Sequence, residues 1–166
     1  MGWTAITFYT EGTGYQAEAQ KLAQSCRQQD IPLAIYPVRN AGSWRQNLNA
    51  KSATILQAMT GHPGKDIAFL DADAIIRHRP ALFDFLSTAQ EWDLAAHDYV
   101  ASRLIPGGEL LSGTLWIANT EAGRRIVTAW DKLARSRPDL RHQRCLQIVL
   151  EQDQAARVYN LPAGYT

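Results

Sequence analysis

A short apolar run over residues 67–70, ending in the triplet Asp71-Ala72-Asp73, constrains this chain more than any other segment. Four consecutive apolar residues are typical of a strand that is covered on both faces, as in the sheet of an α/β protein. Ligands of open α/β sheets bind outside the carboxyl ends of the strands, where both aspartates are expected to lie. The run therefore predicts a buried strand with a polar site at its end.

The spacing of the two aspartates indicates a site for a hard divalent cation. In an extended chain, residues i and i+2 point to the same side, so we expect Asp71 and Asp73 to share one ion. Two protein carboxylates leave coordination positions open, and phosphate oxygens fill such positions well. The alternative interpretation is an Asp-rich turn that caps the next element.

Strand and helix patterns alternate along the whole chain. Pro37 favours an edge position or a strand end for the second strand. Thr120 is expected to start the helix at residues 122–134. Residues 39–50 are predicted to be irregular. The alternation predicts one α/β domain with a mixed, mostly parallel sheet flanked by helices. Strands are expected at residues 5–9, 33–38, 67–70, 93–97, 110–118 and 156–161, and helices at residues 15–29, 51–59, 80–86, 122–134 and 143–154.

Composition limits the partners that this chain can have. Seventeen basic and sixteen acidic side chains give a net charge of +1, so no overall field points to nucleic acid. No segment approaches the roughly 18 consecutive apolar residues of a membrane span. The N-terminus lacks a basic stretch followed by a long apolar one, so a cytoplasmic protein is expected. Cys26 and Cys145 form no Cys-x-x-Cys pair, and a structural zinc site is not predicted.

One local concentration of basic residues has two interpretations. A solvated helical face with its following loop is the favoured one. A surface for an anionic acceptor or for membrane head groups is the alternative. The cluster comprises Arg124, Arg125, Lys132, Arg135, Arg137, Arg141 and Arg144.

Four further segments flank the aspartate triplet in a recognisable order. Residues 42–47 (Gly-Ser-Trp-Arg-Gln-Asn) and Lys51 precede it, and residues 112–117 and the pair Asp153-Gln154 follow it. Together they resemble the nucleotide-diphospho-sugar glycosyltransferases of the GT-A fold, which carry a metal-binding Asp-x-Asp. The resemblance implies a Rossmann-like fold, a nucleotide-diphosphate sugar donor with UDP favoured, an acceptor of unknown identity, and Mn²⁺ or Mg²⁺ held by Asp71 and Asp73.

The segments before the aspartates supply candidate substrate ligands. By the resemblance, Tyr9 and Thr10 after the first strand contact the base and ribose. Lys51 is a point charge that suits a diphosphate, and the amide of Asn47 suits a sugar or ribose hydroxyl. Trp44 is assigned to the same site, with burial in the core as its alternative. Ala72, between the two aspartates, is also assigned to substrate binding.

The segments after the aspartates supply the remaining candidates. His97 and Asp98 follow the fourth strand and are assigned to sugar binding and proton transfer. Ser112 and Gly113 are small residues that allow a substrate to approach the backbone, although Leu111 stands where similar families often have Asn. By the resemblance, Asp153 and Gln154 lie near the donor sugar and the acceptor. Asp98 and Asp153 are the candidate bases for an inverting reaction, whereas the resemblance favours retention.

Two other functions are compatible with the sequence. The sequence ends at Thr166, before the segment that gives many such enzymes a third metal ligand, so a non-catalytic module that binds a nucleotide or sugar is one alternative. A phosphatase of the haloacid-dehalogenase type also uses Asp-x-Asp with Mg²⁺, its first Asp being the nucleophile. That class is expected to carry the motif on its first strand, whereas here it follows the third predicted strand.

Overall fold

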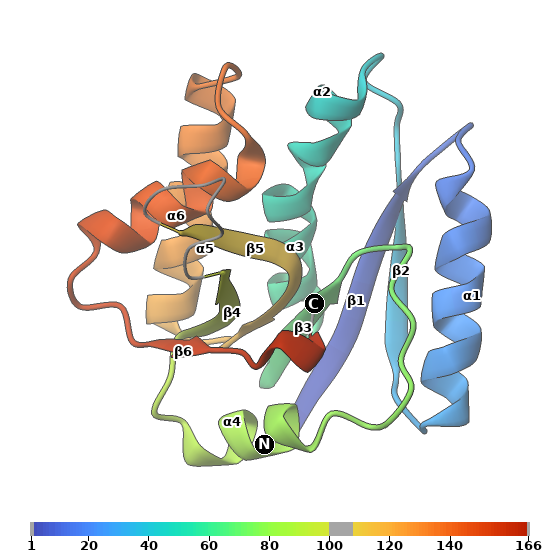
Figure 1. Cartoon of the computed structure of the whole chain (residues 1–166), viewed down its shortest axis with the longest axis horizontal. Helices are drawn as coiled ribbons and strands as arrows, with labels where there is room; N and C mark the ends of the chain where they lie inside the picture. The colour runs from blue at the N-terminus through green and yellow to red at the C-terminus, as the bar shows by residue number, and fades with distance from the viewer. Residues whose placement is uncertain (1, 100–107, 166) are drawn as a thin grey trace.

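Six strands form one mixed sheet in the order β2-β1-β3-β5-β4-β6 in the computed structural model, which describes residues 2–99 and 108–165 (Figure 1). Strands β1, β2 and β3 run parallel to one another, and β4 runs parallel to β6. Strand β5 is antiparallel to both β3 and β4. The sheet is therefore mixed and mostly parallel, as predicted. The strands are β1 (Gly2–Thr10), β2 (Leu33–Val38), β3 (Lys65–Leu70), β4 (Leu94–Tyr99), β5 (Glu109–Ile117) and β6 (Val158–Asn160).

Helices cover both faces of this sheet, and most of them lie where the sequence predicts them. Strand β2 lies at the edge of the sheet. Pro37 is accommodated there because no strand on the outer side of β2 requires a hydrogen bond from the N–H that proline lacks. The helices are α1 (Tyr15–Gln28), α2 (Trp44–Leu48), α3 (Ala50–Gly61), α4 (Ala81–Ala89), α5 (Glu121–Ser136) and α6 (His142–Gln152), and a short 3₁₀ turn, η1, covers Ala163–Tyr165.

Alternate residues of the strands face two separate cores. Ile67 and Phe69 pack with α3, α5 and α6, whereas Ala68 and Leu70 pack with α1 and α4 on the opposite face. All four residues are at most 3% exposed. Burial on both faces explains why this strand is an uninterrupted apolar run. Figure 1 shows α1 at one side of the sheet and α5 and α6 at the other.

The prediction for residues 39–50 is wrong in part. Residues 39–50 are not irregular throughout, because Trp44–Leu48 form α2 and Ala50 begins α3. The Ser43 hydroxyl caps α2 by accepting a hydrogen bond from the Gln46 backbone N–H at 3.3 Å. A serine three residues before a glutamine is a recognised start signal for a helix, so the sequence did contain this information.

Helix α5 starts as predicted and packs very closely against the end of β5. The Thr120 hydroxyl accepts a hydrogen bond from the Gly123 backbone N–H at 3.2 Å, which caps the helix. A Cβ atom on Gly123 would lie 2.0 Å from the backbone oxygen of Ala118, so only glycine fits there. Among the described residues, no helix has the length and apolar character needed to cross a bilayer.

Candidate functional site

The aspartate triplet lies at the carboxyl end of β3, where the topology of the sheet leaves a crevice. The chain places β2 on one side of β1 and β3 on the other, so the order of connection reverses between β1 and β3. Such a switch point is where open α/β sheets bind their ligands. Because β5 is antiparallel to β3, its early residues lie at this same edge, and the Asp71 backbone N–H donates to the Gly113 carbonyl at 2.8 Å.

The conformation of the triplet differs from the extended one that we expected. Residues 72 and 73 lie in a turn, and the Ala74 backbone N–H donates to the Asp71 carbonyl at 3.0 Å. Strand alternation therefore does not place the two carboxylates on one side. The turn does so instead, because Asp71 and Asp73 both line the pocket beside β1.

Lys51 is the direct partner of Asp71. Its Nζ lies 2.8 Å from Asp71 Oδ1, 2.9 Å from the Ser112 carbonyl oxygen and 3.4 Å from the Ser112 hydroxyl. The ammonium also lies 4.8 Å from the centre of the Phe69 ring, and the residue is only 3% exposed. Three acceptors satisfy the three N–H groups of an ammonium, so Lys51 holds Asp71 and β5 together.

The surroundings of Asp71 shift the pKa of its carboxyl in opposite directions. Partial burial raises the pKa of its carboxyl above the ordinary value, the Lys51 ammonium lowers it, and the Asp73 charge raises it. Gly113 makes room for this carboxyl, since a Cβ there would lie 3.1 Å from Asp71 Oδ2. The absence of a side chain at Gly113 thus leaves room for the side chain of Asp71, and the predicted approach of a substrate to Gly113 stays a prediction.

A pocket of about 380 Å³ lies over the carboxyl ends of β1 and β3. The predicted residues Tyr9, Thr10, Trp44, Asn47 and Ala72 line it together with both aspartates. Of the described residues that line it, these two aspartates alone carry charged side chains. The other lining residues are Phe8, Thr13, Tyr15, Asn40, Gly42, Ser43 and Leu48.

The helix α2 forms one wall of this pocket. Trp44 is 64% exposed, so the alternative that its indole is buried in the core is wrong. Asn47 Oδ1 accepts a hydrogen bond from the Ala41 backbone N–H at 2.7 Å, and its amide donates to Asn40 Oδ1 at 3.2 Å. Asn47 thus shapes the loop of the pocket wall, and its predicted contact with a hydroxyl stays a prediction.

A second pocket of about 340 Å³ adjoins the first and shares Asp71, Trp44 and Leu48 with it. The predicted residues Lys51, Ser112 and Gly113 line this second pocket. Arg45, His142 and Gln143, to which we assigned no role in a site, also line it, as does Arg141 of the predicted basic cluster, whose alternative interpretation was a surface for an anionic acceptor.

His142 is buried between the second pocket and α5. Burial lowers the pKa of its imidazole to about 3, with the Lys51 charge acting in the same direction, so the ring is neutral. The Ser52 hydroxyl donates to Asp131 at 2.9 Å and lies 3.4 Å from His142 Nε2, so it is free only to accept from that nitrogen. His142 therefore carries its proton on Nε2. Its Nδ1 is a buried acceptor with no partner in the part of the chain that the structure describes.

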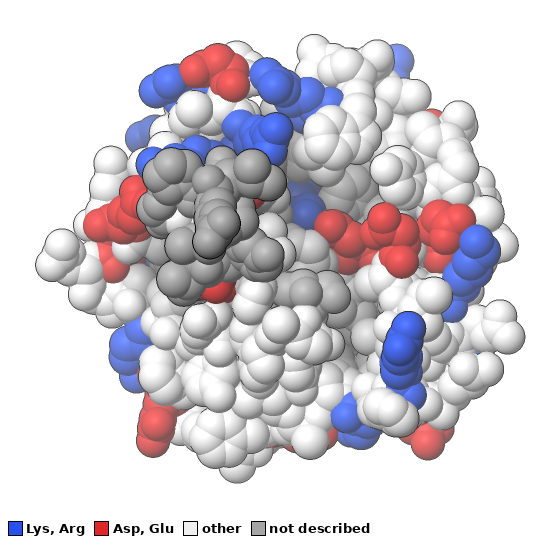
Figure 2. Space-filling model, in the orientation of Figure 1, with Lys and Arg blue, Asp and Glu red and all other residues white. Residues whose placement is uncertain are grey.

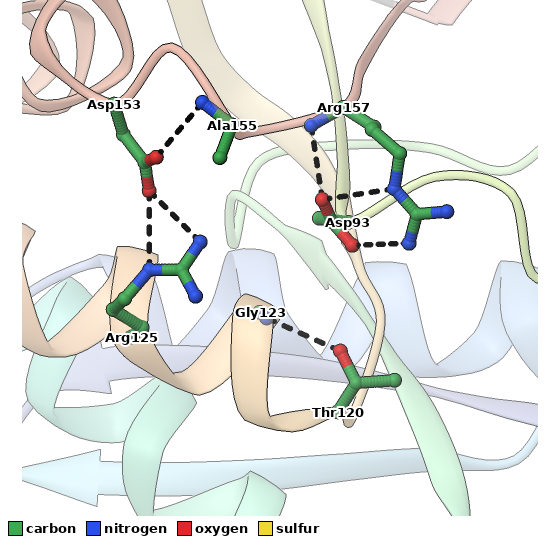
Figure 3. Close-up of polar contacts among 7 residues, drawn as sticks. All are labelled: Asp93, Thr120, Gly123, Arg125, Asp153, Ala155 and Arg157. Atoms are coloured by element: carbon green, nitrogen blue, oxygen red, sulfur yellow. Dashed lines mark hydrogen bonds and ion pairs between the residues drawn. The ribbon is translucent and has the colours of Figure 1, made fainter.

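The four candidates near the end of β4 and after α6 are not among the described residues that line either pocket. His97 Nδ1 lies 2.6 Å from the Leu161 carbonyl oxygen, and the Asp98 backbone N–H donates to Asn160. Asp153 accepts from the Arg125 guanidinium at 3.1 and 3.2 Å and caps the Ala155 backbone N–H (Figure 3).

Gln154 is exposed and, like His97, Asp98 and Asp153, lines neither pocket. Figure 3 also shows the buried Asp93, which accepts from both the side chain and the backbone of Arg157. Burial opposes ionisation of Asp93, but the Arg157 contacts outweigh it and the pKa is lowered. This pair joins residues 64 positions apart, and the sequence carried no signal for it.

Most members of the predicted basic cluster have partners within the fold. Arg135 pairs with Asp131, Arg137 with Asp139 and Arg144 with Glu151. The Arg124 guanidinium donates to the Met59 carbonyl at 2.6 Å. The favoured interpretation of a solvated face fits these residues, whereas Arg141 lines the second pocket.

No family model and no curated protein matches the chain. Solved structures do. A glycosyltransferase involved in the glycosylation of the major capsid of PBCV-1 superposes with a TM-score of 0.65 at 12% identity, covering 95% of this chain and 81% of that one. The apo-form glycosyltransferase GlyE of Streptococcus pneumoniae TIGR4 gives 0.60 at 14% identity, and this chain spans less than half of it, with coverages of 96% and 45%.

A third solved structure is a nucleotidyltransferase. The 2-C-methyl-D-erythritol 4-phosphate cytidylyltransferase of Thermus thermophilus gives a TM-score of 0.50 at 11% identity, covering 99% of this chain and 91% of that one. Likeness at such identities shows the fold alone. It confirms the predicted α/β class with a Rossmann-like, GT-A-like sheet, and two of these three neighbours are glycosyltransferases.

Proposed function

We propose that this chain is a metal-dependent glycosyltransferase that moves a sugar from a nucleotide-diphosphate sugar, with UDP as the favoured nucleotide, to an acceptor hydroxyl. The observation that carries the proposal is the charge of the first pocket. Among its described lining residues, Asp71 and Asp73 supply all the charged side chains. A diphosphate is repelled by two carboxylates unless a cation lies between them, so an anionic nucleotide fits this pocket only together with a metal ion.

The donor set suits the predicted ion. Carboxylate oxygens are ligands that Mg²⁺ and Mn²⁺ favour, and two of them leave positions for phosphate oxygens. Among the described residues, no group of three or more His, Cys, Asp or Glu could hold a metal, so the diphosphate is expected to complete the coordination. When bound, Mn²⁺ or Mg²⁺ would supply positive charge to the leaving diphosphate.

The residues of the chain have separate tasks in this proposal. Lys51 fixes the rotamer of Asp71 through its contact of 2.8 Å, so that the carboxylate is positioned before the donor binds. The exposed indole of Trp44 offers an apolar face for a ring of the substrate. Tyr9 and Thr10, at the end of β1, line the part of the pocket assigned to the base and ribose.

The reaction breaks the bond between the anomeric carbon and the diphosphate oxygen, and forms one between that carbon and the acceptor oxygen. The acceptor proton leaves with the nucleoside diphosphate or to solvent. Asp98 and Asp153 line neither pocket, so the candidate bases for inversion lie outside them.

Thermal-shift titration tests the proposal. UDP, GDP, CTP and UDP-sugars are each titrated with and without Mn²⁺, on the wild type, Asp73→Asn and the control Glu91→Gln. Glu91 is exposed and precedes β4, at the opposite edge of the sheet from the pockets. A ligand at about 100 times its Kd stabilises by roughly 2.7 kcal/mol.

Metal-dependent stabilisation by UDP, lost in Asp73→Asn and kept in Glu91→Gln, is the expected result. Stabilisation by CTP alone would favour nucleotidyl transfer, as in the cytidylyltransferase neighbour. Binding of UDP-sugars without transfer or hydrolysis would favour the non-catalytic module. No shift with any nucleotide would overturn the proposal.

A further inference from the structure

The two adjoining pockets differ in the sign of their charge. Among the described residues, two carboxylates and no basic side chain line the first pocket, whereas three basic side chains and the shared Asp71 line the second, the basic ones being Arg45, Lys51 and Arg141. Figure 2 shows basic side chains gathered in the upper part of one face of the molecule and a row of acidic ones right of the centre. The second pocket therefore suits an anionic group, whereas the first suits a cation.

The two arginines of the second pocket are available to a ligand. Arg45 is exposed and forms no ion pair with any residue that the structure describes, although its charge helps to lower the pKa of the Asp139 carboxyl. The Arg141 side chain is 75% exposed, and its Nη1 lies 3.9 Å from Glu109 Oε1, the limit of an ion pair. Glu109 instead accepts a hydrogen bond from the Gln143 amide. Lys51 is neutralised by Asp71, so the arginines supply the free charge.

The backbone at the start of α6 adds to this potential. Arg141 is the N-cap of the helix, its side chain does not cap the first N–H groups, and the first turn contains no acidic residue. Free N–H groups and the helix dipole favour an anion at this end. His142, which is 5% exposed, also lines the pocket, and its neutral ring contributes no charge.

We propose that the second pocket binds the acceptor, and that the acceptor carries a phosphate or carboxylate group held by Arg45 and Arg141. This inference rests on the proposed function, because it takes the first pocket as the site of the donor nucleotide. The pockets share Asp71 and Trp44, so a donor sugar leaving the first meets an acceptor hydroxyl in the second. Guanidinium groups bind both kinds of oxyanion through paired N–H donors.

Binding of small anionic sugars tests the inference directly. Glucose 6-phosphate and glucuronate are titrated into the ¹⁵N-labelled protein, with glucose as the neutral probe, and Kd is obtained from chemical shifts. We expect the anionic sugars to shift the amides of residues 141–144 and the Trp44 indole, and glucose to bind at least about tenfold more weakly. Binding of only one anionic sugar would identify the oxyanion as phosphate or carboxylate.

Matched variants separate a built site from general charge. Arg141→Gln and Arg45→Gln should each weaken the anionic probes by about tenfold. Arg144→Gln makes the same charge change one turn along α6, where the arginine pairs with Glu151 and does not line the pocket, so its Kd should match the wild type. Equal binding of glucose and the anionic sugars, or equal losses in Arg144→Gln and Arg141→Gln, would overturn the inference.

The same samples distinguish this inference from the proposed function. UDP with Mn²⁺ is titrated into the wild type, and its shifts are expected around Asp71 and Tyr9. Failure of UDP to bind would refute the donor site while the anionic probes still report on the second pocket. UDP binding together with no binding of the anionic sugars would refute the acceptor inference alone.

Discussion

Replacing Lys51 with Met should destabilise the fold through the loss of one ammonium. Lys51 is 3% exposed, and its Nζ contacts Asp71 at 2.8 Å and the Ser112 carbonyl at 2.9 Å. Breaking a fully buried ion pair costs about 3–5 kcal/mol. The Asp71 side chain is 41% exposed and water replaces part of its lost contact, so we expect about 2 kcal/mol.

Urea unfolding of Lys51→Met measures this loss of unfolding free energy. In thermal unfolding, a loss of this size in a chain of this length should lower the Tm by about 4–8 °C. Lys21→Met is the control, because Lys21 also lies 2.8 Å from a carboxylate, that of Glu18, but is 62% exposed. That exposed pair should contribute less than about 1 kcal/mol. A loss in Lys51→Met no larger than that in Lys21→Met would refute the reasoning.

A double-mutant cycle isolates the pair. Adding Asp71→Asn to Lys51→Met should cost less than the sum of the two single changes, with a coupling of about 1 kcal/mol or more in the unfolding free energy. Mn²⁺ should restore part of the stability of Lys51→Met, because no ammonium then competes at Asp71. Additive effects would show that the two side chains do not interact.

Three further predictions concern a buried ring, a helix contact and the pocket wall. The pKa of His142 is about 3 in the fold, below its unfolded value near 6.5, so the unfolded state binds the extra proton and stability falls as pH decreases between these values. Between pH 7.5 and 5.0 the wild type should lose about 2 kcal/mol in urea unfolding from this group, and His142→Gln should flatten that slope. Gly123→Ala places a Cβ 2.0 Å from the Ala118 backbone oxygen, so it should cost about 3 kcal/mol or more, whereas Gly61→Ala, with nothing within 4 Å, should stay near the wild type. Trp44→Ala should weaken UDP-sugar binding by about tenfold in calorimetry with little change in Tm, since the indole is 64% exposed; an unchanged Kd would exclude a stacking contact.

The local sequence predicted the elements of the fold well because the local signals agree with the packing. The run at 67–70 is apolar because both faces of β3 are covered, and Pro37 lies on an edge strand. The threonine that caps α5 is also visible in the sequence. The helix α2 was missed because its short polar segment has no apolar periodicity, although Ser43 and Gln46 mark its start.

The candidate site was predicted only in part, because its geometry depends on contacts between distant elements. The pairing of Lys51 with Asp71 joins α3 to the end of β3, and no local pattern encodes it. The close approach of Gly113 depends on the antiparallel register of β5. The position of Arg141 at a pocket becomes visible only once the start of α6 is placed beside α2 and β5.

Paramagnetic broadening by Mn²⁺ is the most direct test of the metal-dependent donor site. Substoichiometric Mn²⁺ is added to the ¹⁵N-labelled protein with and without UDP, and the loss of amide signals is mapped onto the fold. The proposal predicts that signals around Asp71, Asp73 and Gly113 broaden first, more strongly with UDP, and that Asp73→Asn abolishes the effect. Broadening centred on other carboxylates, such as Asp139 or Asp153, with no effect of UDP, would contradict it.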